Sequence, residues 1–293
     1  MSIKKGIYAA AMTIINKDLS VNINATIKHS EKLIEQGCHS TVIGGSTGMM
    51  QYISSKVKRE LIDKMSVSKF KENFVFGTGT NSINENTQLM KHCIKNGVDR
   101  FLIMPPAYYK YNDEGVYIFY ANIVQQIPES KIILYNFEKL SGYKFSINII
   151  EKLVKDFPKQ ILAVKDSSYN LYEELKIPNF MIFPGSETKL LKGLELGCSG
   201  IISAICNVTA PLARKVYDDF HNKKKQTFND RLCEIRKIFD KYNLISAVHS
   251  FISREDEKYK FVLPPLSLLP KEIEIKMIRE LEALDFYPEK KAA

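Results

Sequence analysis

The sequence predicts an α/β protein, a (β/α)8 TIM barrel followed by a C-terminal helical appendage. Over roughly the first 225 of 293 residues, short apolar segments alternate with longer segments of helical periodicity. Eight strands alternating with eight helices fit this length without a long structureless loop, as such a barrel requires. After His221 the strand pattern disappears. An open, doubly wound sheet is the alternative that the same alternation allows.

The predicted strands are short runs of apolar and β-branched residues, bounded by glycine, proline or polar residues. We expect them at Gly6–Ile15, Thr41–Gly45, Asn73–Gly79, Asp99–Met104, Lys131–Tyr135, Ile161–Lys165, Phe180–Pro184 and Gly200–Ser203. Seven of the barrel helices can be located between them, at Asn22–Gln36, Ser54–Phe70, Asn84–Asn96, Asp113–Gln126, Ser146–Phe157, Glu187–Leu196 and Thr209–His221.

Three further helices are expected in the C-terminal part of the chain, at Thr227–Tyr242, Leu244–Glu257 and Lys271–Leu284. The last of them follows Pro270, a residue that interrupts helices rather than continuing them. The predicted division is therefore a catalytic barrel over residues 1–225 and a helical region over residues 226–293.

The composition argues against a nucleic-acid partner. The formal net charge of +9 comes almost entirely from lysine, because the chain has seven arginines. Lysine scattered over helices usually forms a solvated face. The densest cluster, Lys223–Lys225, has no interleaved aromatic residues, so nucleic-acid binding is not expected.

Other sequence features predict a cytoplasmic protein that needs neither a metal nor a cofactor. No apolar run has the length of a membrane span, and the N-terminus lacks the apolar segment of a signal peptide. The five cysteines include no CxxC pair, so we expect buried, inert thiols. The five histidines show no metal-binding spacing.

The segment Ile161–Ser168 contains the most informative residue, Lys165. Four apolar residues lead directly to this lysine, so it lies at the C-terminal end of a predicted buried strand. Burial disfavours the charged form of a lysine and frees its lone pair, and a neutral amine can attack a ketone to form a Schiff base. The alternative is a lysine that ends a strand and extends into solvent.

Other predicted strands end in polar groups that suit the same chemistry. In a (β/α)8 barrel the active site lies at the C-terminal ends of the strands. The second strand runs into Gly44–Gly48, where glycines let backbone N–H groups approach an anion and two hydroxyls can bind a carboxylate. The fourth ends at Pro105–Tyr109 and the fifth at Tyr135 and Asn136, so phenols and a carboxylate cradle are expected to surround Lys165.

Taken together, these motifs resemble the dihydrodipicolinate synthase and N-acetylneuraminate lyase family, the pyruvate-dependent class I aldolases. The resemblance covers the whole barrel and weakens in the helical tail. It is carried by Gly44–Gly48, Pro106–Tyr109, Tyr135–Asn136 with Ser141–Gly142, Val164–Asp166, Gly185–Glu187, Gly200–Ser203 with Asn207, and Val262–Leu266 in the tail.

The resemblance implies a role for each matching residue. Lys165 would form the Schiff base with pyruvate, and Ser46 and Thr47 with their backbone amides would hold its carboxylate. Tyr135 would be the general acid and base, because a phenol can both donate and accept a proton. Tyr108 would complete a relay through Thr47 to Tyr135, reaching in from a neighbouring subunit of a homotetramer built as a dimer of dimers. The other implied substrate-binding residues are Gly45, Gly185, Glu187, Ile202 and Ser203.

Departures from the family pattern bear on the second substrate. The synthase branch has an arginine that binds the carboxylate of the amino-acid aldehyde, and Leu140 stands at the matching position with only Lys139 beside it. Sialic-acid lyases place two acids and a serine against the sugar, whereas this chain has Glu187, Thr188 and Ala204. Two other departures have no functional explanation from the sequence: Met49 replaces the usual acid and Glu138 the usual proline.

The sequence therefore predicts a Schiff-base aldolase or lyase that reversibly joins pyruvate to an aldehyde, with a 2-keto-3-deoxy sugar acid as the joined substrate. The first alternative is 4-hydroxy-tetrahydrodipicolinate synthase, which would share the first half-reaction. The second alternative is a barrel that binds a keto acid without turnover, as a sensor or regulator, because a fold alone does not fix a function.

Overall fold

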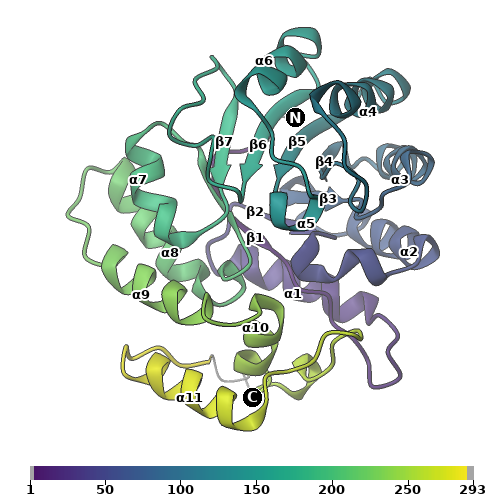
Figure 1. Cartoon of the computed structure of the whole chain (residues 1–293). Coiled ribbons are helices and arrows are strands. Elements are labelled where there is room, and N and C mark those ends of the chain that lie inside the picture. Colours follow the sequence, from purple (N-terminus) through teal and green to yellow (C-terminus); the bar gives the residue numbers. More distant parts are fainter. Residues whose placement is uncertain (1–2, 289–293) are drawn as a thin grey trace.

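Eight parallel strands form a barrel in the computed structural model of the chain, which describes residues 3–288 (Figure 1). They are β1 Gly6–Ala10, β2 Ser40–Ile43, β3 Phe74–Gly77, β4 Arg100–Ile103, β5 Lys131–Asn136, β6 Ile161–Asp166, β7 Met181–Pro184 and β8 Gly200–Ser203. Their order is β7-β6-β5-β4-β3-β2-β1-β8. The Ser199 N–H donates to the Ile182 carbonyl at 2.9 Å where β7 meets the start of β8. The predicted barrel is confirmed, and the open sheet is wrong.

Helices surround the barrel and continue into the appendage. The α-helices are α1 Ile23–Glu35, α2 Ser55–Ser66, α3 Ile83–Lys95, α4 Asp113–Gln126, α5 Glu138–Ser141, α6 Ile147–Asp156, α7 Leu190–Glu195, α8 Cys206–His221, α9 Asn229–Phe239, α10 Leu244–Ile252 and α11 Lys271–Glu282. Short 3-10 turns lie at η1 Ser46–Gly48, η2 Met50–Tyr52, η3 Lys71–Asn73, η4 Glu187–Lys189 and η5 Glu257–Tyr259. Six helices begin after a serine or asparagine whose side chain accepts a first-turn N–H, as N-cap residues do.

The eighth barrel helix, which the alternation predicts between the sixth and seventh strands, is absent. The described segment 167–180 is a loop, with Tyr169 at φ 59° and Asn179 at φ 60°, left-handed values that interrupt a helix. Pro178 also disfavours the helical backbone conformation for the residue before it. The first strand also ends at Ala10 rather than Ile15, because Ile15 pairs in antiparallel fashion with Val21.

Side chains alternate between the barrel interior and the helical layer along each strand. The interior cluster includes Tyr8, Ile133, Tyr135 and Ala163, whereas Val164 belongs to the cluster beneath the helices. This alternation decides which strand-end residues can meet inside the barrel.

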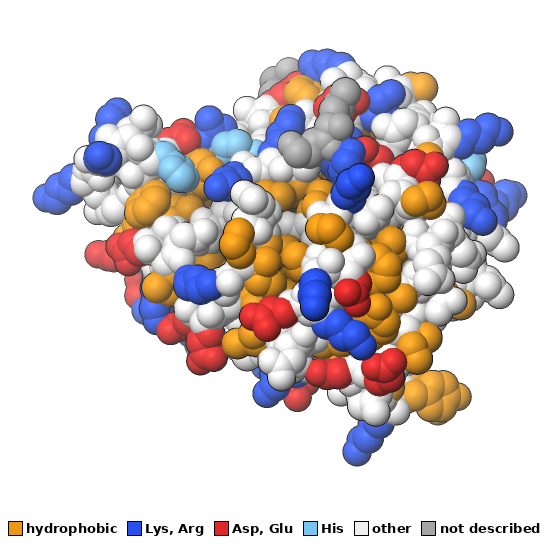
Figure 2. Space-filling model, turned by 90° about the horizontal axis from the view of Figure 1, so that it is seen from above, with side chains coloured by type: hydrophobic (Ala, Val, Ile, Leu, Met, Phe, Trp, Pro, Cys, Tyr) orange, Lys and Arg blue, Asp and Glu red, His pale blue; other side chains and the backbone are white. Residues whose placement is uncertain are grey.

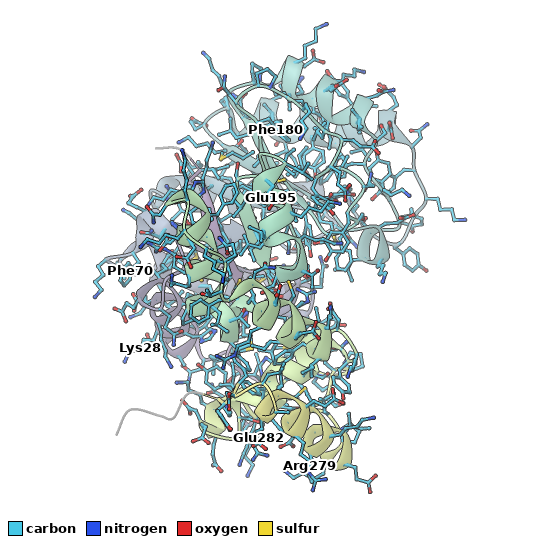
Figure 3. All side chains as sticks on the ribbon, turned by 90° about the vertical axis from the view of Figure 1, so that its left-hand side faces the viewer. Lys28, Phe70, Phe180, Glu195, Arg279 and Glu282 are labelled. Atoms are coloured by element: carbon cyan, nitrogen blue, oxygen red, sulfur yellow. The ribbon has the colours of Figure 1, made fainter. Side chains whose placement is uncertain are left out.

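The C-terminal helices form a layer against one side of the barrel, and Figure 3 shows Arg279 and Glu282 of α11 at the end remote from Phe180. Met12, just after β1, shares an apolar cluster with Phe239, Phe251 and Met277 of the appendage. The appendage is thus packed onto the barrel, while the domain division at residues 225 and 226 stays a prediction.

The distribution of charged side chains on the surface and the state of the cysteines agree with what the composition predicts. On the face seen in Figure 2, lysine and arginine side chains are dispersed among acidic and apolar ones rather than gathered in one stripe. Within residues 3–288, no helix has the length and apolar character to cross a membrane. The five cysteines are free and four are buried, and burial raises the pKa of the Cys38 thiol to about 12.

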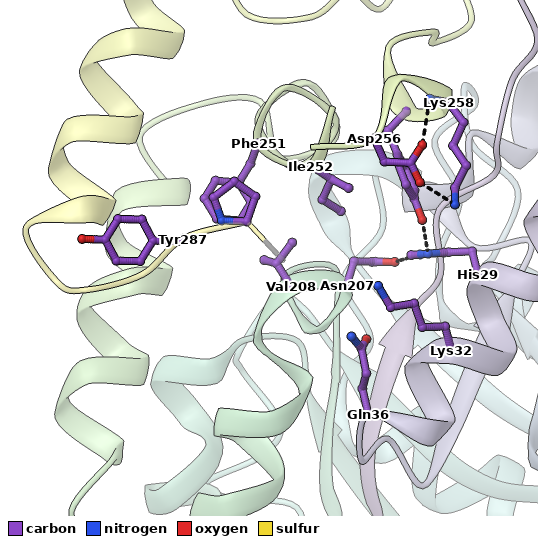
Figure 4. A pocket seen from close by; sticks show the side chains of 12 residues that line it. His29, Lys32, Gln36, Asn207, Val208, Phe251, Ile252, Asp256, Lys258 and Tyr287 are labelled. Carbon is purple, nitrogen blue, oxygen red and sulfur yellow. Dashed lines mark hydrogen bonds and ion pairs between the residues drawn. The ribbon is translucent and has the colours of Figure 1, made fainter. Parts of the chain in front are cut away.

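A buried histidine joins the appendage to the barrel (Figure 4). The Tyr259 hydroxyl lies 2.9 Å from His29 Nδ1, and His29 Nε2 lies 2.8 Å from Asn207 Oδ1. Because Asn207 Oδ1 also accepts the Met12 N–H, it is an acceptor, so His29 donates from Nε2. In the neutral imidazole, Nδ1 is then available to accept the Tyr259 hydroxyl proton.

Burial lowers the pKa of His29 from 6.5 to about 4. As the pH falls, the unfolded chain therefore binds a proton at this histidine before the folded chain does. The contribution of neutral His29 to the stability of the folded protein is complete above pH 6.5 and is lost between about pH 6.5 and pH 4. We expect about 3 kcal/mol of the free energy of unfolding to disappear over this window. Urea unfolding at several pH values should show a smaller loss in His29→Gln than in wild type, whereas the exposed-site control His221→Gln should follow wild type. Equal pH dependence in His29→Gln and wild type would contradict the assignment.

Candidate active site

Strands β5 and β6 bring Tyr135 and Lys165 together. The two residues are register partners, and both face the barrel interior at the C-terminal ends of their strands. The Lys165 Nζ lies 4.1 Å from the centre of the Tyr135 ring. Each side chain is 4% exposed, so the amine and the phenol share a site that is shielded from bulk water.

The residues after this pair point outward and fix the loop that follows. Asn136 Nδ2 donates to Asp166 Oδ1 at 2.8 Å, and the Asp166 carboxylate accepts the N–H groups of Tyr169, Leu171 and Tyr172. Burial raises the pKa of Asp166, although these hydrogen bonds oppose the shift. Asp166 thus anchors the loop that replaces the predicted helix, directly after the lysine.

The glycine-rich loop after β2 forms the wall next to Tyr135. Gly44 has φ 91°, and a Cβ there would lie 2.3 Å from the Gly77 carbonyl oxygen, so this position requires glycine. Gly45 precedes the 3-10 turn Ser46–Gly48. The Ser46 hydroxyl lies 3.1 Å from the Tyr135 hydroxyl. The next residue in the sequence, Thr47, is buried. The structure therefore joins Tyr135 to Ser46, not to Thr47.

Tyr108 lies outside this cluster in the single chain. Its side chain is 88% exposed, it has φ 91°, and its ring packs edge-on against Tyr109 at 5.0 Å between centroids. Within residues 3–288 it makes no hydrogen bond with Thr47 or Tyr135. The expected relay is therefore not formed inside one subunit.

Glu187 and Ser203, which the resemblance assigns to substrate binding, take part in an internal hydrogen-bond network in the single chain, and their contact with substrate stays a prediction. Glu187 is 0% exposed, and its carboxylate accepts hydrogen bonds from Ser203 Oγ at 2.8 Å, Thr209 Oγ1 at 3.2 Å and Arg236 Nη1 at 2.8 Å. Ser203 follows the inward-facing Ile202 and therefore points to the helical layer. This geometry favours a structural role for both residues.

Arg236 on α9 was not identified from the sequence. Its guanidinium binds Glu187, the Gly185 carbonyl at 3.4 Å and Asp240 at 2.8 Å. Burial alone would lower the pKa of Arg236, but the carboxylates of Glu187 and Asp240 outweigh it and raise the pKa above its ordinary value. No local motif marks Arg236, since its main partner lies 49 residues away.

The remaining predicted positions fall at the same end of the barrel. A Cβ on Gly185 would lie 2.3 Å from Ser167 Oγ and 3.2 Å from Ser167 Cα, so the loops after β6 and β7 approach closely there and a glycine fits without displacing Ser167. Ile202 faces the interior and is paired with Tyr8. Leu140 on α5 is 42% exposed, and Lys139 beside it is also exposed.

The rest of the described structure offers no alternative centre of the same kind. A cavity of about 270 Å³ lies between α1, α8 and the appendage, and none of its lining residues is a predicted site residue (Figure 4). Among the described residues, no three His, Cys, Asp or Glu side chains are grouped so that they could hold a metal ion. The absence of a metal or cofactor requirement stays a prediction.

The whole barrel and most of the appendage match a known family. The model of the dihydrodipicolinate synthetase family matches residues 4–284. The chain belongs to this family. It is therefore an enzyme of a family of aldolases and lyases, as the resemblance predicts.

Relatives in the family carry out different reactions. The chain is 27% identical to a 2-dehydro-3-deoxy-D-gluconate/2-dehydro-3-deoxy-phosphogluconate aldolase of Picrophilus torridus, covering 76% of this chain and 85% of that protein. It is 29% identical to a 4-hydroxy-tetrahydrodipicolinate synthase of Hydrogenobaculum sp., covering 87% and 90%. It is also 29% identical to an N-acetylneuraminate lyase of Actinobacillus pleuropneumoniae, covering 73% and 74%.

A solved structure has the same fold. Dihydrodipicolinate synthase from Agrobacterium tumefaciens superposes with a TM-score of 0.87 at 24% identity, covering 96% of this chain and 99% of that one. The fold of the dihydrodipicolinate synthetase family is thus shared over nearly the full length of both chains.

The Arg236–Glu187 ion pair gives a stability prediction. Arg236→Met leaves the Glu187 carboxylate without its cation in a fully buried site, so urea unfolding should show a loss of about 3–5 kcal/mol. The double variant Glu187→Met/Arg236→Met should regain most of that loss, because no buried charge remains unpaired there. As a control, Arg214→Met removes a half-exposed pair with Asp218 and should cost at most about 1 kcal/mol. A loss in Arg236→Met no larger than in the control would contradict the role of the pair.

Proposed function

We propose that this chain is a Schiff-base-forming, pyruvate-dependent aldolase or lyase. The observation that carries the proposal is the Lys165 Nζ, 4.1 Å from the Tyr135 ring centre, in a shielded site at the C-terminal end of the barrel. The proposal rests on an amine nucleophile and an acid–base group held at one point, which is what aldol chemistry through an imine requires.

The reaction can be written for cleavage of a 2-keto acid. The Lys165 amine adds to the C2 ketone to give a carbinolamine, and the Tyr135 phenol donates its proton to the departing hydroxyl, so that one water leaves and a protonated imine forms. The resulting Tyr135 phenolate removes the proton of the C4 hydroxyl while the C3–C4 bond breaks. The bonding electrons move to the imine nitrogen, the aldehyde leaves and an enamine of pyruvate remains. Protonation at C3 and addition of water release pyruvate and restore the amine.

The loop after β2 supplies the proposed carboxylate site. Ser46 and Thr47 offer hydroxyls and backbone N–H groups beside Tyr135, and Gly45 has no side chain to obstruct the approach of an anion. A carboxylate held there would place the neighbouring ketone next to Lys165. Orientation of this kind accounts for much of the rate gain in covalent catalysis.

For the aldehyde partner, we propose a sugar-derived compound, so that the joined substrate is a 2-keto-3-deoxy sugar acid. The relative from Picrophilus torridus, named as an aldolase for such acids, supports this choice. The alternative is 4-hydroxy-tetrahydrodipicolinate synthase, supported by the relative from Hydrogenobaculum sp.. Against it, Leu140 cannot pair with a carboxylate, and the buried Arg236 is already occupied by Glu187 and Asp240.

Borohydride reduction in the presence of pyruvate tests the half-reaction. Intact-mass and peptide mass spectrometry should find a reduced pyruvate adduct on the peptide that contains Lys165, and Lys165→Ala should give neither adduct nor turnover. Tyr135→Phe keeps the amine, so it should still form the adduct while its turnover falls by roughly 10²–10⁴-fold. A well-folded wild-type protein without adduct would refute the aldolase proposal and favour a barrel that binds keto acids without turnover. Turnover with a panel of aldehydes would then separate the sugar-acid and synthase assignments.

We also propose that the enzyme acts as a homo-oligomer, a dimer of dimers, in which Tyr108 of one subunit reaches the site of its neighbour. The exposed pair Tyr108 and Tyr109 in the single chain supports the proposal, since 88% exposure is unusual for a tyrosine in an isolated fold. A relay that crosses a subunit interface would make activity depend on assembly.

Subunit mixing tests this arrangement. Tyr108→Phe and Lys165→Ala should each be impaired alone, whereas refolding them together should restore activity, because a mixed pair contains one site with native Lys165 and native Tyr108. The comparison is with each variant refolded alone and with a mixture of two Lys165→Ala preparations. If the mixed sample is no more active than the better parent, Tyr108 does not act across subunits.

A further inference from the structure

Met49, for which the sequence offers no function, lies directly after the proposed carboxylate loop. It has φ 55°, a left-handed conformation that is uncommon for a residue with a side chain, and it is 2% exposed. Its backbone N–H donates to the Ser46 carbonyl at 3.0 Å and closes the turn Ser46–Gly48. The backbone of Met49 is thus part of the turn that holds the two hydroxyls.

The Met49 side chain contacts the appendage. The Leu263 N–H donates to the Met49 thioether sulfur at 3.3 Å, a link between residues 214 positions apart. Around this contact, Met49 packs with Ile15 and Val262, and Phe261 and Leu266 lie against them. Residues 261–266, which we call the contact segment, therefore supply both the hydrogen-bond donor and an apolar seat for Met49.

The turn is also held by Thr13, which follows β1 of the barrel. Thr13 Oγ1 donates to the Gly48 carbonyl at 2.6 Å, and a Cβ on Gly48 would lie 2.9 Å from the same Thr13 atom. The turn is therefore held both by Thr13 and by the contact segment. Because Ser46 lies only three residues before Met49 in a closed turn, displacement of Met49 would move the Ser46 hydroxyl away from Tyr135.

We propose that Met49 is a positioning residue, through which the contact segment of the appendage sets the geometry of the carboxylate-binding turn. The proposal rests on the proposed function, since it assumes that the turn binds pyruvate. It gives the appendage a role in substrate affinity beyond covering one side of the barrel. The thioether accepts a backbone N–H that no aliphatic side chain at this position could accept.

Three variants separate hydrogen bonding from packing. Met49→Leu keeps volume and apolar character but removes the acceptor, whereas Met49→Gln keeps an acceptor on a chain of similar length. Met277→Leu is the matched control, because Met277 is also fully buried, in the apolar cluster of the appendage. Each protein is reduced with borohydride over a range of pyruvate concentrations, and the concentration that gives half-maximal Lys165 adduct is measured. Thermal unfolding is followed in parallel.

In Met49→Leu, the half-saturating pyruvate concentration should rise about tenfold while the maximal adduct stays near the wild-type level, because only the carboxylate turn is disturbed. Met49→Gln should recover most of the affinity, and Met277→Leu should match wild type. Unchanged affinity in Met49→Leu would overturn the proposal, as would a loss that Met49→Gln does not repair or that Met277→Leu shares. If wild type itself forms no adduct, the proposed function fails and the positioning role falls with it.

Discussion

The alternation of side chains along two neighbouring parallel strands is the constraint on which the candidate site depends. Because β5 and β6 are paired in register, Tyr135 and Lys165 face the interior together, and Asn136 and Asp166, one residue later, face outward together. A shift of one residue in either strand would exchange a reactive residue for a structural one. The inward pair forms the candidate site and the outward pair fixes the following loop, so a single register provides both the proposed reacting groups and their support.

The appendage is attached to the mouth of the barrel by polar contacts as well as by apolar packing. Arg236 reaches the strand ends through Glu187, His29 joins Tyr259 to Asn207, and Met49 accepts the Leu263 N–H. Each contact is at least partly buried and directional, so it specifies one orientation of the appendage, which apolar surface alone would not. The loops that follow the barrel strands are therefore held by contacts with the appendage as well as by contacts within the barrel.

The sequence was sufficient to predict the barrel and to place the candidate site residues at the ends of its strands, while their roles stay predictions. Lys165 and Tyr135 could be found because an apolar strand that ends in a reactive side chain is visible in the sequence, and the glycine-rich loop could be found from its composition. The absence of one barrel helix could not be predicted. The loop in its place depends on residues with left-handed backbone conformation and on hydrogen bonds accepted by Asp166, and neither feature has a periodic signature in the sequence. Arg236 could not be found either, because its main partner Glu187 lies 49 residues away in the sequence, and only the folded structure brings the two charges together.

The residues proposed to bind the two ends of the substrate differ in how deeply they are buried. The groups proposed for the pyruvate end lie in or beside the barrel strands, are mostly buried and are fixed by register and by closed turns. At the proposed aldehyde end, Leu140 and Lys139 on the short helix α5 are exposed. Exposed loop residues can change with little effect on the core, whereas the buried amine and phenol cannot. In the proposed function, the aldehyde is therefore expected to be selected by exposed residues of this kind, of which Leu140 on α5 is the one that the sequence singles out.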